Sequence, residues 1–208
     1  HFIRKPVEKN KTEALKTFLR LAAINNKSPS RRSRINAYLQ QYERFESNTV
    51  YLDSAYQLLN GLGEKSTLFY KEWVLYFHLK GEKQALVNWV NNTFGRNIFN
   101  DLKTVSYDNS DAWCAYRIGE AYLNLYSPDK AIVFLERAVE LAPYILDFRV
   151  KLGNAFFMSN QYEAAETTYK NALTENPNLE EALSNLGYVQ IVLEDFESAE
   201  TNLEKSLA

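Results

Sequence analysis

The stretch YRIGEAYLNLYSPDKAIVFLERAVELAP, residues 116–143, contains small and apolar residues that recur 34 positions further along the chain. Four series share this spacing: Gly119, Gly153 and Gly187; Ala131, Ala165 and Ala199; Ile118, Leu152 and Leu186; and Ala138, Ala172 and Ser206. Pro143 and Pro177 also lie 34 residues apart. A fixed internal period indicates a repeat protein. The sequence therefore predicts three consecutive units at residues 112–145, 146–179 and 180–208, the last of them incomplete.

The recurring residues have a common physical basis. Each glycine follows an apolar residue and lets a neighbouring helix approach closely, and each alanine leaves only a methyl group between two helices. A larger side chain follows four residues after each alanine, namely Leu135, Tyr169 and Leu203. Proline lacks an N–H donor and disfavours helical angles in the residue before it, so each proline is expected just after a helix end.

This pattern resembles the tetratricopeptide repeat (TPR) family, whose 34-residue unit is a helix–turn–helix. The resemblance covers residues 112–208. It implies an all-α fold, a right-handed α-solenoid of antiparallel helix pairs, with irregular pairs in the N-terminal half. The resemblance also implies a non-catalytic scaffold that binds a protein or peptide along the inner surface formed by the first helix of each unit.

The first half of the chain reads as a series of helices without a strand pattern. Residues 1–11 have no period and are expected to form an extended arm, followed by a helical, repeat-like region at 12–110 and the three repeats at 111–208. Apolar residues at helical spacing predict helices at about 12–25, 30–45, 48–60, 66–80, 82–93 and 96–105. Gly61, Gly63 and Gly81 mark expected helix ends, because glycine is common just past a helix C-terminus.

Composition excludes several classes of protein. A hydrophobic content of 46% excludes a disordered chain, and no apolar run is long enough to span a membrane. One cysteine and two histidines cannot supply a zinc cluster of His and Cys. No Ser/His/Asp or Cys/His arrangement and no phosphate-binding loop is present, so we predict neither an enzyme nor a cofactor. The compartment, cytoplasmic or periplasmic, stays open.

The net charge of −2 conceals a division of charge along the chain. Residues 1–110 carry 17 Lys and Arg against 10 Asp and Glu, a net +7, whereas residues 111–208 carry 7 against 16, a net −9. The two halves could attract each other or separate partners. The overall acidity argues against a nucleic-acid partner.

The TPR resemblance assigns a set of residues to the inner surface. Aromatic side chains, a methionine, amides and carboxylates together suit an extended peptide or a helix, and their charge favours a basic or apolar ligand. The assigned residues are Trp113, Tyr116, Glu120, Asn124, Asp147, Val150, Asn154, Met158, Glu181, Ser184 and Tyr188. The alternative is that several of them only pack between consecutive units.

Two weaker features remain. Arg31, Arg32 and Arg34 open a helix and could hold an anion, although solvated surface charge or pairing with acidic residues explains them as well. His78 and Cys114 have no catalytic companions, so packing or surface roles are favoured over a ligand, base or reactive thiol.

The first six residues, HFIRKP, resemble a segment of bacterial multihaem c-type cytochromes that carry C-terminal TPR tails. This resemblance implies an alternative function as an accessory domain of an extracytoplasmic redox protein, while a tag remnant or chance match is the other explanation. We expect the sequence to be part of a longer protein. We also expect self-association through the incomplete third unit, where Leu203 and Leu207 lack a following helix.

Overall fold

The computed structural model describes residues 30–44, 49–62, 69–94 and 109–207, and all regular structure in these ranges is helical. The helices are α2 (Arg31–Arg44), α3 (Thr49–Asn60), α4 (Tyr70–Lys80), α5 (Lys83–Phe94), α7 (Asn109–Asn124), α8 (Pro128–Leu141), α9 (Leu146–Met158), α10 (Tyr162–Glu175), α11 (Glu180–Val192) and α12 (Phe196–Ser206). The structure thus confirms the predicted all-α fold. The helices expected at 12–25 and 96–105, and the arm at 1–11, lie outside the described residues.

The chain divides into two compact units, at residues 1–80 and 81–208. The first unit contains α2, α3 and α4 around a core of Ile35, Leu39, Leu59 and Val74. Aromatic rings fill the contact of α3 with α4, where Tyr56 stacks on Tyr76 with ring centroids 5.6 Å apart. The three-part division drawn from the repeat pattern stays a prediction.

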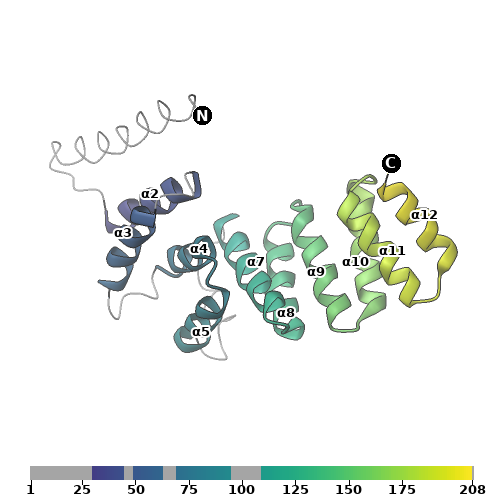
Figure 1. The fold of residues 1–208 in the computed structure, drawn as a ribbon, viewed down its shortest axis with the longest axis horizontal. Helices are drawn as coiled ribbons and strands as arrows, with labels where there is room; N and C mark the ends of the chain where they lie inside the picture. The colour runs from purple at the N-terminus through teal and green to yellow at the C-terminus, as the bar shows by residue number, and fades with distance from the viewer. Residues whose placement is uncertain (1–29, 45–48, 63–68, 95–108, 208) are drawn as a thin grey trace, which may run out of the picture. The chain divides into compact units, whose positions relative to one another are not determined.

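The second unit contains α5 and then three helix pairs, α7 with α8, α9 with α10 and α11 with α12 (Figure 1). Each pair also packs against the next, through α8 with α9 and α10 with α11. The core between pairs includes Val150, Ala165, Tyr169, Ala182 and Leu186, all at most 2% exposed. This arrangement is the helix-pair solenoid that the period predicts.

The recurring glycines lie where the sequence predicts close helix contacts. A Cβ atom on Gly119 would lie 2.7 Å from Cγ of Leu135, and one on Gly187 would lie 2.6 Å from Cγ of Leu203. On Gly153 it would overlap the ring of Tyr169. Each glycine of a first helix therefore faces the large side chain of the second helix of the same pair, and Ala131, Ala165 and Ala199 are buried beside these contacts.

The turns inside the three pairs share one backbone feature. Tyr126, Asn160 and Glu194 have φ of 53°, 59° and 63°, the left-handed region that is uncommon for residues other than glycine. These residues are 34 apart, so the backbone repeats with the same period although the side chains differ. The shared conformation reverses the chain between the first and second helices.

Candidate functional site

The residues that the sequence assigns to an inner surface come from the first helices α7, α9 and α11, and we call them the predicted binding face. Three of their apolar side chains are open to solvent: Trp113, Met158 and Tyr188 are 36%, 38% and 57% exposed. Asn124, Asp147 and Glu181 are also exposed, and Tyr116, Glu120, Asn154 and Ser184 are half-buried. Val150 is only 1% exposed and packs in the core, so its side chain is not available to a partner.

An aromatic cluster anchors one end of this face. Trp113 meets Tyr116 edge to face at 5.5 Å between ring centroids, and Tyr116 stacks on Phe148 at 4.8 Å. Phe148 is fully buried between the first and second pairs. The packing fixes both rings while leaving part of Trp113 exposed, which suits a rigid contact with a partner.

Carboxylates from all three first helices act electrostatically on Tyr116. Burial, the largest cause, and the charges of Glu120, Asp147 and Glu181 together raise the pKa of Tyr116 to about 12. Lys151 Nζ lies 3.2 Å from Oε1 of Glu181 and offsets part of this negative charge. The three acidic residues of the predicted set therefore all influence the same tyrosine.

This raised pKa gives a pH dependence. Tyrosine ordinarily titrates near pH ~10, so above that pH Tyr116 ionises in the unfolded chain before it ionises in the folded one. Its contribution to stability is complete below the ordinary pKa and is lost as the pH rises towards about 12. We expect the fall in unfolding free energy between about pH 9 and pH 11 to be smaller in Tyr116→Phe than in the wild type, measured by urea titration. An equal fall in both proteins would contradict this assignment.

The Asn154 side chain forms hydrogen bonds that connect neighbouring helices of the fold. Its Oδ1 accepts hydrogen bonds from the Tyr169 hydroxyl at 2.5 Å and from Asn185 Nδ2 at 2.9 Å. These bonds join α9, α10 and α11. Replacing Asn154 would therefore leave the buried Tyr169 hydroxyl and the half-buried Asn185 amide without their acceptor, so this residue is a poor choice for testing partner binding.

The arginines of α2 are engaged within the first unit. Arg31 donates a hydrogen bond to the carbonyl oxygen of Gly61 at 3.2 Å, and Arg32 Nε lies 2.7 Å from Oε1 of the buried Glu72. The Arg32 guanidinium also lies over the Phe69 ring. These contacts are structural roles for Arg31 and Arg32, and the anion site that includes Arg34 stays a prediction.

His78 is exposed in the last turn of α4, and Cys114 is buried in α7. Within the described residues there is no group of three His, Cys, Asp or Glu side chains arranged to hold a metal ion. In that same part of the chain, no helix has the length and apolar character needed to cross a membrane.

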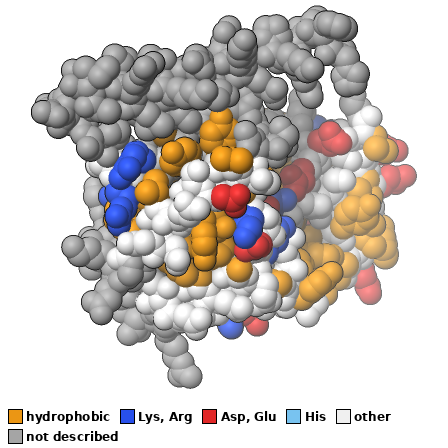
Figure 2. Space-filling model, turned by 60° about the vertical axis from the view of Figure 1, so that its left-hand side comes forward, with side chains coloured by type: hydrophobic (Ala, Val, Ile, Leu, Met, Phe, Trp, Pro, Cys, Tyr) orange, Lys and Arg blue, Asp and Glu red, His pale blue; other side chains and the backbone are white. Residues whose placement is uncertain are grey.

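On the face drawn in Figure 2, hydrophobic side chains form several small areas separated by polar and charged ones.

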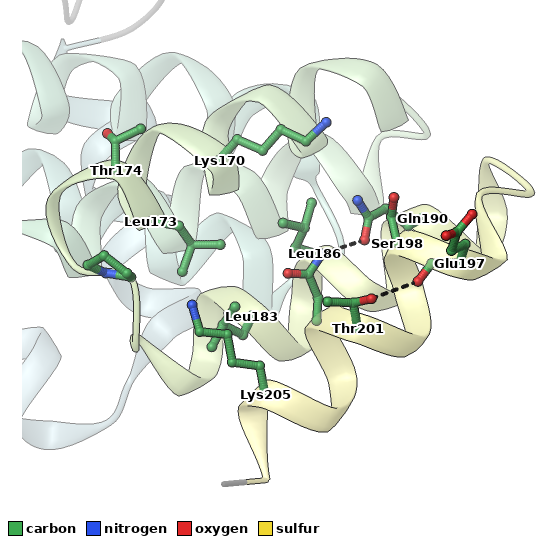
Figure 3. A pocket seen from close by; sticks show the side chains of 12 residues that line it. Lys170, Leu173, Thr174, Leu183, Leu186, Gln190, Glu197, Ser198, Thr201 and Lys205 are labelled. Atoms are coloured by element: carbon green, nitrogen blue, oxygen red, sulfur yellow. Dashed lines mark hydrogen bonds between the residues drawn. The ribbon is translucent and has the colours of Figure 1, made fainter.

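A cavity of about 550 Å³ lies elsewhere in the second unit, between α10, α11 and α12 (Figure 3). Leu173, Leu183 and Leu186 line it together with Lys170, Thr201 and Lys205. Sequence reasoning missed this cavity. One available signal was Gln190, which stands where the first two units have Tyr122 and Phe156.

A smaller cavity of about 380 Å³ occupies the corresponding position in the preceding repeat. Arg149 and Glu175 both line it and form an ion pair at 2.5 Å that joins α9 to α10. In the third repeat, Leu183 occupies the position of Arg149 and cannot form the corresponding ion pair.

Family comparisons agree with the repeat pattern. A model described as a tetratricopeptide repeat matches residues 114–144, and one described as a TPR repeat matches residues 153–191. No curated protein matches the chain by sequence. The cytochrome resemblance of the first residues finds no support in these matches.

Solved structures show the same fold at low identity. MamA (residues 41 to the end) from Desulfovibrio magneticus RS-1 aligns with a TM-score of 0.63 at 18% identity, over 84% of this chain and 93% of that chain. YrrB, a TPR protein described as having an unusual peptide-binding site, aligns at 0.59 and 18%, over 100% and 91%. A Podosopora anserina putative kinesin light chain with TPR-like repeats aligns at 0.63 and 13%, over 84% and 92%.

The 34-residue period, the helix pairs it builds and these matches agree: the chain contains tetratricopeptide repeats, at residues 114–144 and 153–191, within an all-helical fold like that of solved TPR proteins.

Proposed function

We propose that this protein is a non-catalytic scaffold that binds a segment of another protein along the predicted binding face of α7, α9 and α11. The observation that carries the proposal is the combination of exposed Trp113 and Tyr188 with the carboxylates that act electrostatically on Tyr116. Tyrosine and tryptophan are enriched among residues that dominate binding energy. The similarity to YrrB, whose description names a peptide-binding site, supports a peptide-like partner.

The charge of this face favours a basic or apolar segment. Asp147 and Glu181 are exposed and Glu120 is half-buried, so a lysine or arginine of the partner would find carboxylates beside an aromatic surface. Such complementary charge mainly increases the association rate and the selectivity.

A capture experiment with matched variants tests the proposal. We expect Asp147→Lys combined with Tyr188→Ala to remove partners that the wild-type chain captures from its source cells, because both side chains are exposed on the predicted binding face. The measurement is quantitative mass spectrometry of captured proteins.

The control is Glu163→Lys combined with Tyr144→Ala. Asp147 and Glu163 are both acidic residues in the first turn of a helix, and Tyr144 is 60% exposed in a turn, so the control repeats the chemical changes away from the face. Equal loss of partners in both double variants, or no loss in either, would overturn the proposal.

Self-association through the third unit is a further expectation. Ile191 is 42% exposed, whereas its counterpart in the first unit, Leu123, is 9% exposed, and Leu207 is 88% exposed. If these side chains meet in a second copy, Ile191→Ser with Leu207→Ser should lower the sedimentation coefficient of the concentrated protein. An unchanged coefficient would count against this contact.

The accessory role in a multihaem redox protein stays a prediction, because the residues on which it rests, 1–6, lie outside the described part of the chain.

A further inference from the structure

The cavity between α10, α11 and α12 is a candidate binding site separate from the predicted binding face. Its volume of about 550 Å³ lies within the range of ligand pockets, about 300–1,000 Å³. Leu173 of α10 and Leu183 and Leu186 of α11 give it an apolar lining (Figure 3). Thr174, Ser198 and Thr201 add hydroxyl groups, so the cavity is apolar with a few polar groups at its walls.

Two departures from the repeat accompany this cavity. Leu183 occupies the repeat position of Arg149. It therefore cannot form an ion pair between α11 and α12 like the one that Arg149 and Glu175 form between α9 and α10. Gln190 replaces an aromatic residue and is 2% exposed; its Oε1 accepts a hydrogen bond from Asn202 Nδ2 at 2.8 Å. The amide is thereby held at the wall by α12.

The cavity also has an unusual charge for this half of the chain. Lys170 and Lys205 are two of only seven cations in residues 111–208, which carry a net charge of −9. Lys170 is exposed and pairs with Glu166 on its own helix, a weak type of contact that can be exchanged. For Lys205, the described part of the chain shows no ion pair or ring contact, and its side chain lines the cavity (Figure 3).

We propose that this cavity docks a short segment of a partner protein in which a large apolar side chain is adjacent to a carboxylate. The apolar side chain would lie among Leu173, Leu183 and Leu186. The carboxylate would pair with Lys205 and draw Lys170 from Glu166. Glu197, two turns earlier on α12, disfavours a second carboxylate at that end of the cavity.

The test uses the full chain and four fluorescein-labelled peptides in which a central Leu, Ile, Phe or Trp has two aspartates on each side. Binding is measured by fluorescence anisotropy. The four corresponding peptides with lysine in place of aspartate are the ligand controls. We expect at least one acidic peptide to bind more tightly than its lysine counterpart.

Two variants test whether the acidic peptides bind in the cavity. Thr201→Trp fills the space from an exposed helical position whose hydroxyl donates to the Glu197 carbonyl of its own helix, and we expect a loss of affinity of about tenfold or more. Lys205→Glu reverses the charge and should weaken binding about fivefold.

Matched control positions exist in other repeats of the second compact unit. Thr167 occupies the same repeat position as Thr201, is exposed, and makes the same hydrogen bond, to the carbonyl of Glu163. We expect Thr167→Trp and Lys130→Glu to leave the affinity within about twofold. The Asp147→Lys, Tyr188→Ala variant should also bind normally, which separates this site from the predicted binding face.

Three results would overturn the inference: no acidic peptide binding at about 1 mM, affinity unchanged in both Thr201→Trp and Lys205→Glu, or equal loss in Thr167→Trp. Circular dichroism checks that Thr201→Trp is folded, and Lys205→Glu decides the question if it is not.

Discussion

Truncating Tyr169 to alanine is expected to lower the free energy of unfolding by about 4 kcal/mol, because large-to-small changes at buried aromatic residues remove packing and leave a cavity. Tyr169 is 1% exposed and lies in the core between the second and third helix pairs. Its ring packs against Gly153, and its hydroxyl donates to Asn154. Urea unfolding followed by circular dichroism measures the change.

Tyr169→Phe separates the ring from the hydroxyl. It keeps the packing and removes one hydrogen bond, so we expect a loss of about 1 kcal/mol. Asn154 retains the hydrogen bond from Asn185, which limits the loss. Tyr144→Ala, at an exposed turn position, is the control and should change stability by less than about 0.5 kcal/mol. If Tyr169→Phe were as destabilising as Tyr169→Ala, the hydroxyl rather than the ring would dominate.

Introducing valine at Gly153 is expected to destabilise the protein by about 3 kcal/mol, since overpacking a tight contact forces side chains or backbone to move. A Cβ at this position would lie 2.7 Å from Cζ of the Tyr169 ring. The hydrogen bond of the Tyr169 hydroxyl to Asn154 restricts the movement of the ring. The same urea titration measures the effect.

The double variant Gly153→Val, Tyr169→Ala tests whether the two changes act on the same space. If the valine fills part of the space left by the ring, the double variant should be more stable than the sum of the single changes by at least about 1 kcal/mol. If the two changes in unfolding free energy were strictly additive, the effect of Gly153→Val would not arise from its contact with the Tyr169 ring.

Several features of this molecule were predictable because they depend on local sequence. Helices α3 and α5 begin and end within one residue of the ranges expected from apolar spacing and glycine positions. The glycines at 119, 153 and 187 face large side chains as predicted, because a residue without a Cβ is required where two helices approach closely. The assignment of binding residues stays a prediction. It was also incomplete, because the cavity lined by Lys205 was not foreseen.

The sequence by itself determined the helix pairs and their stacking, because a 34-residue period of small and large residues allows each pair to pack only against the next. The tertiary structure decided what the period does not carry. It placed Tyr126, Asn160 and Glu194 in one left-handed conformation despite their different side chains, and it buried Val150 while leaving Tyr188 exposed. It also brought Glu120, Asp147 and Glu181 within electrostatic reach of Tyr116, and it formed a cavity lined in part by Gln190. Exposure and cavities depend on which neighbouring helix covers a residue, and that neighbour is set by long-range packing.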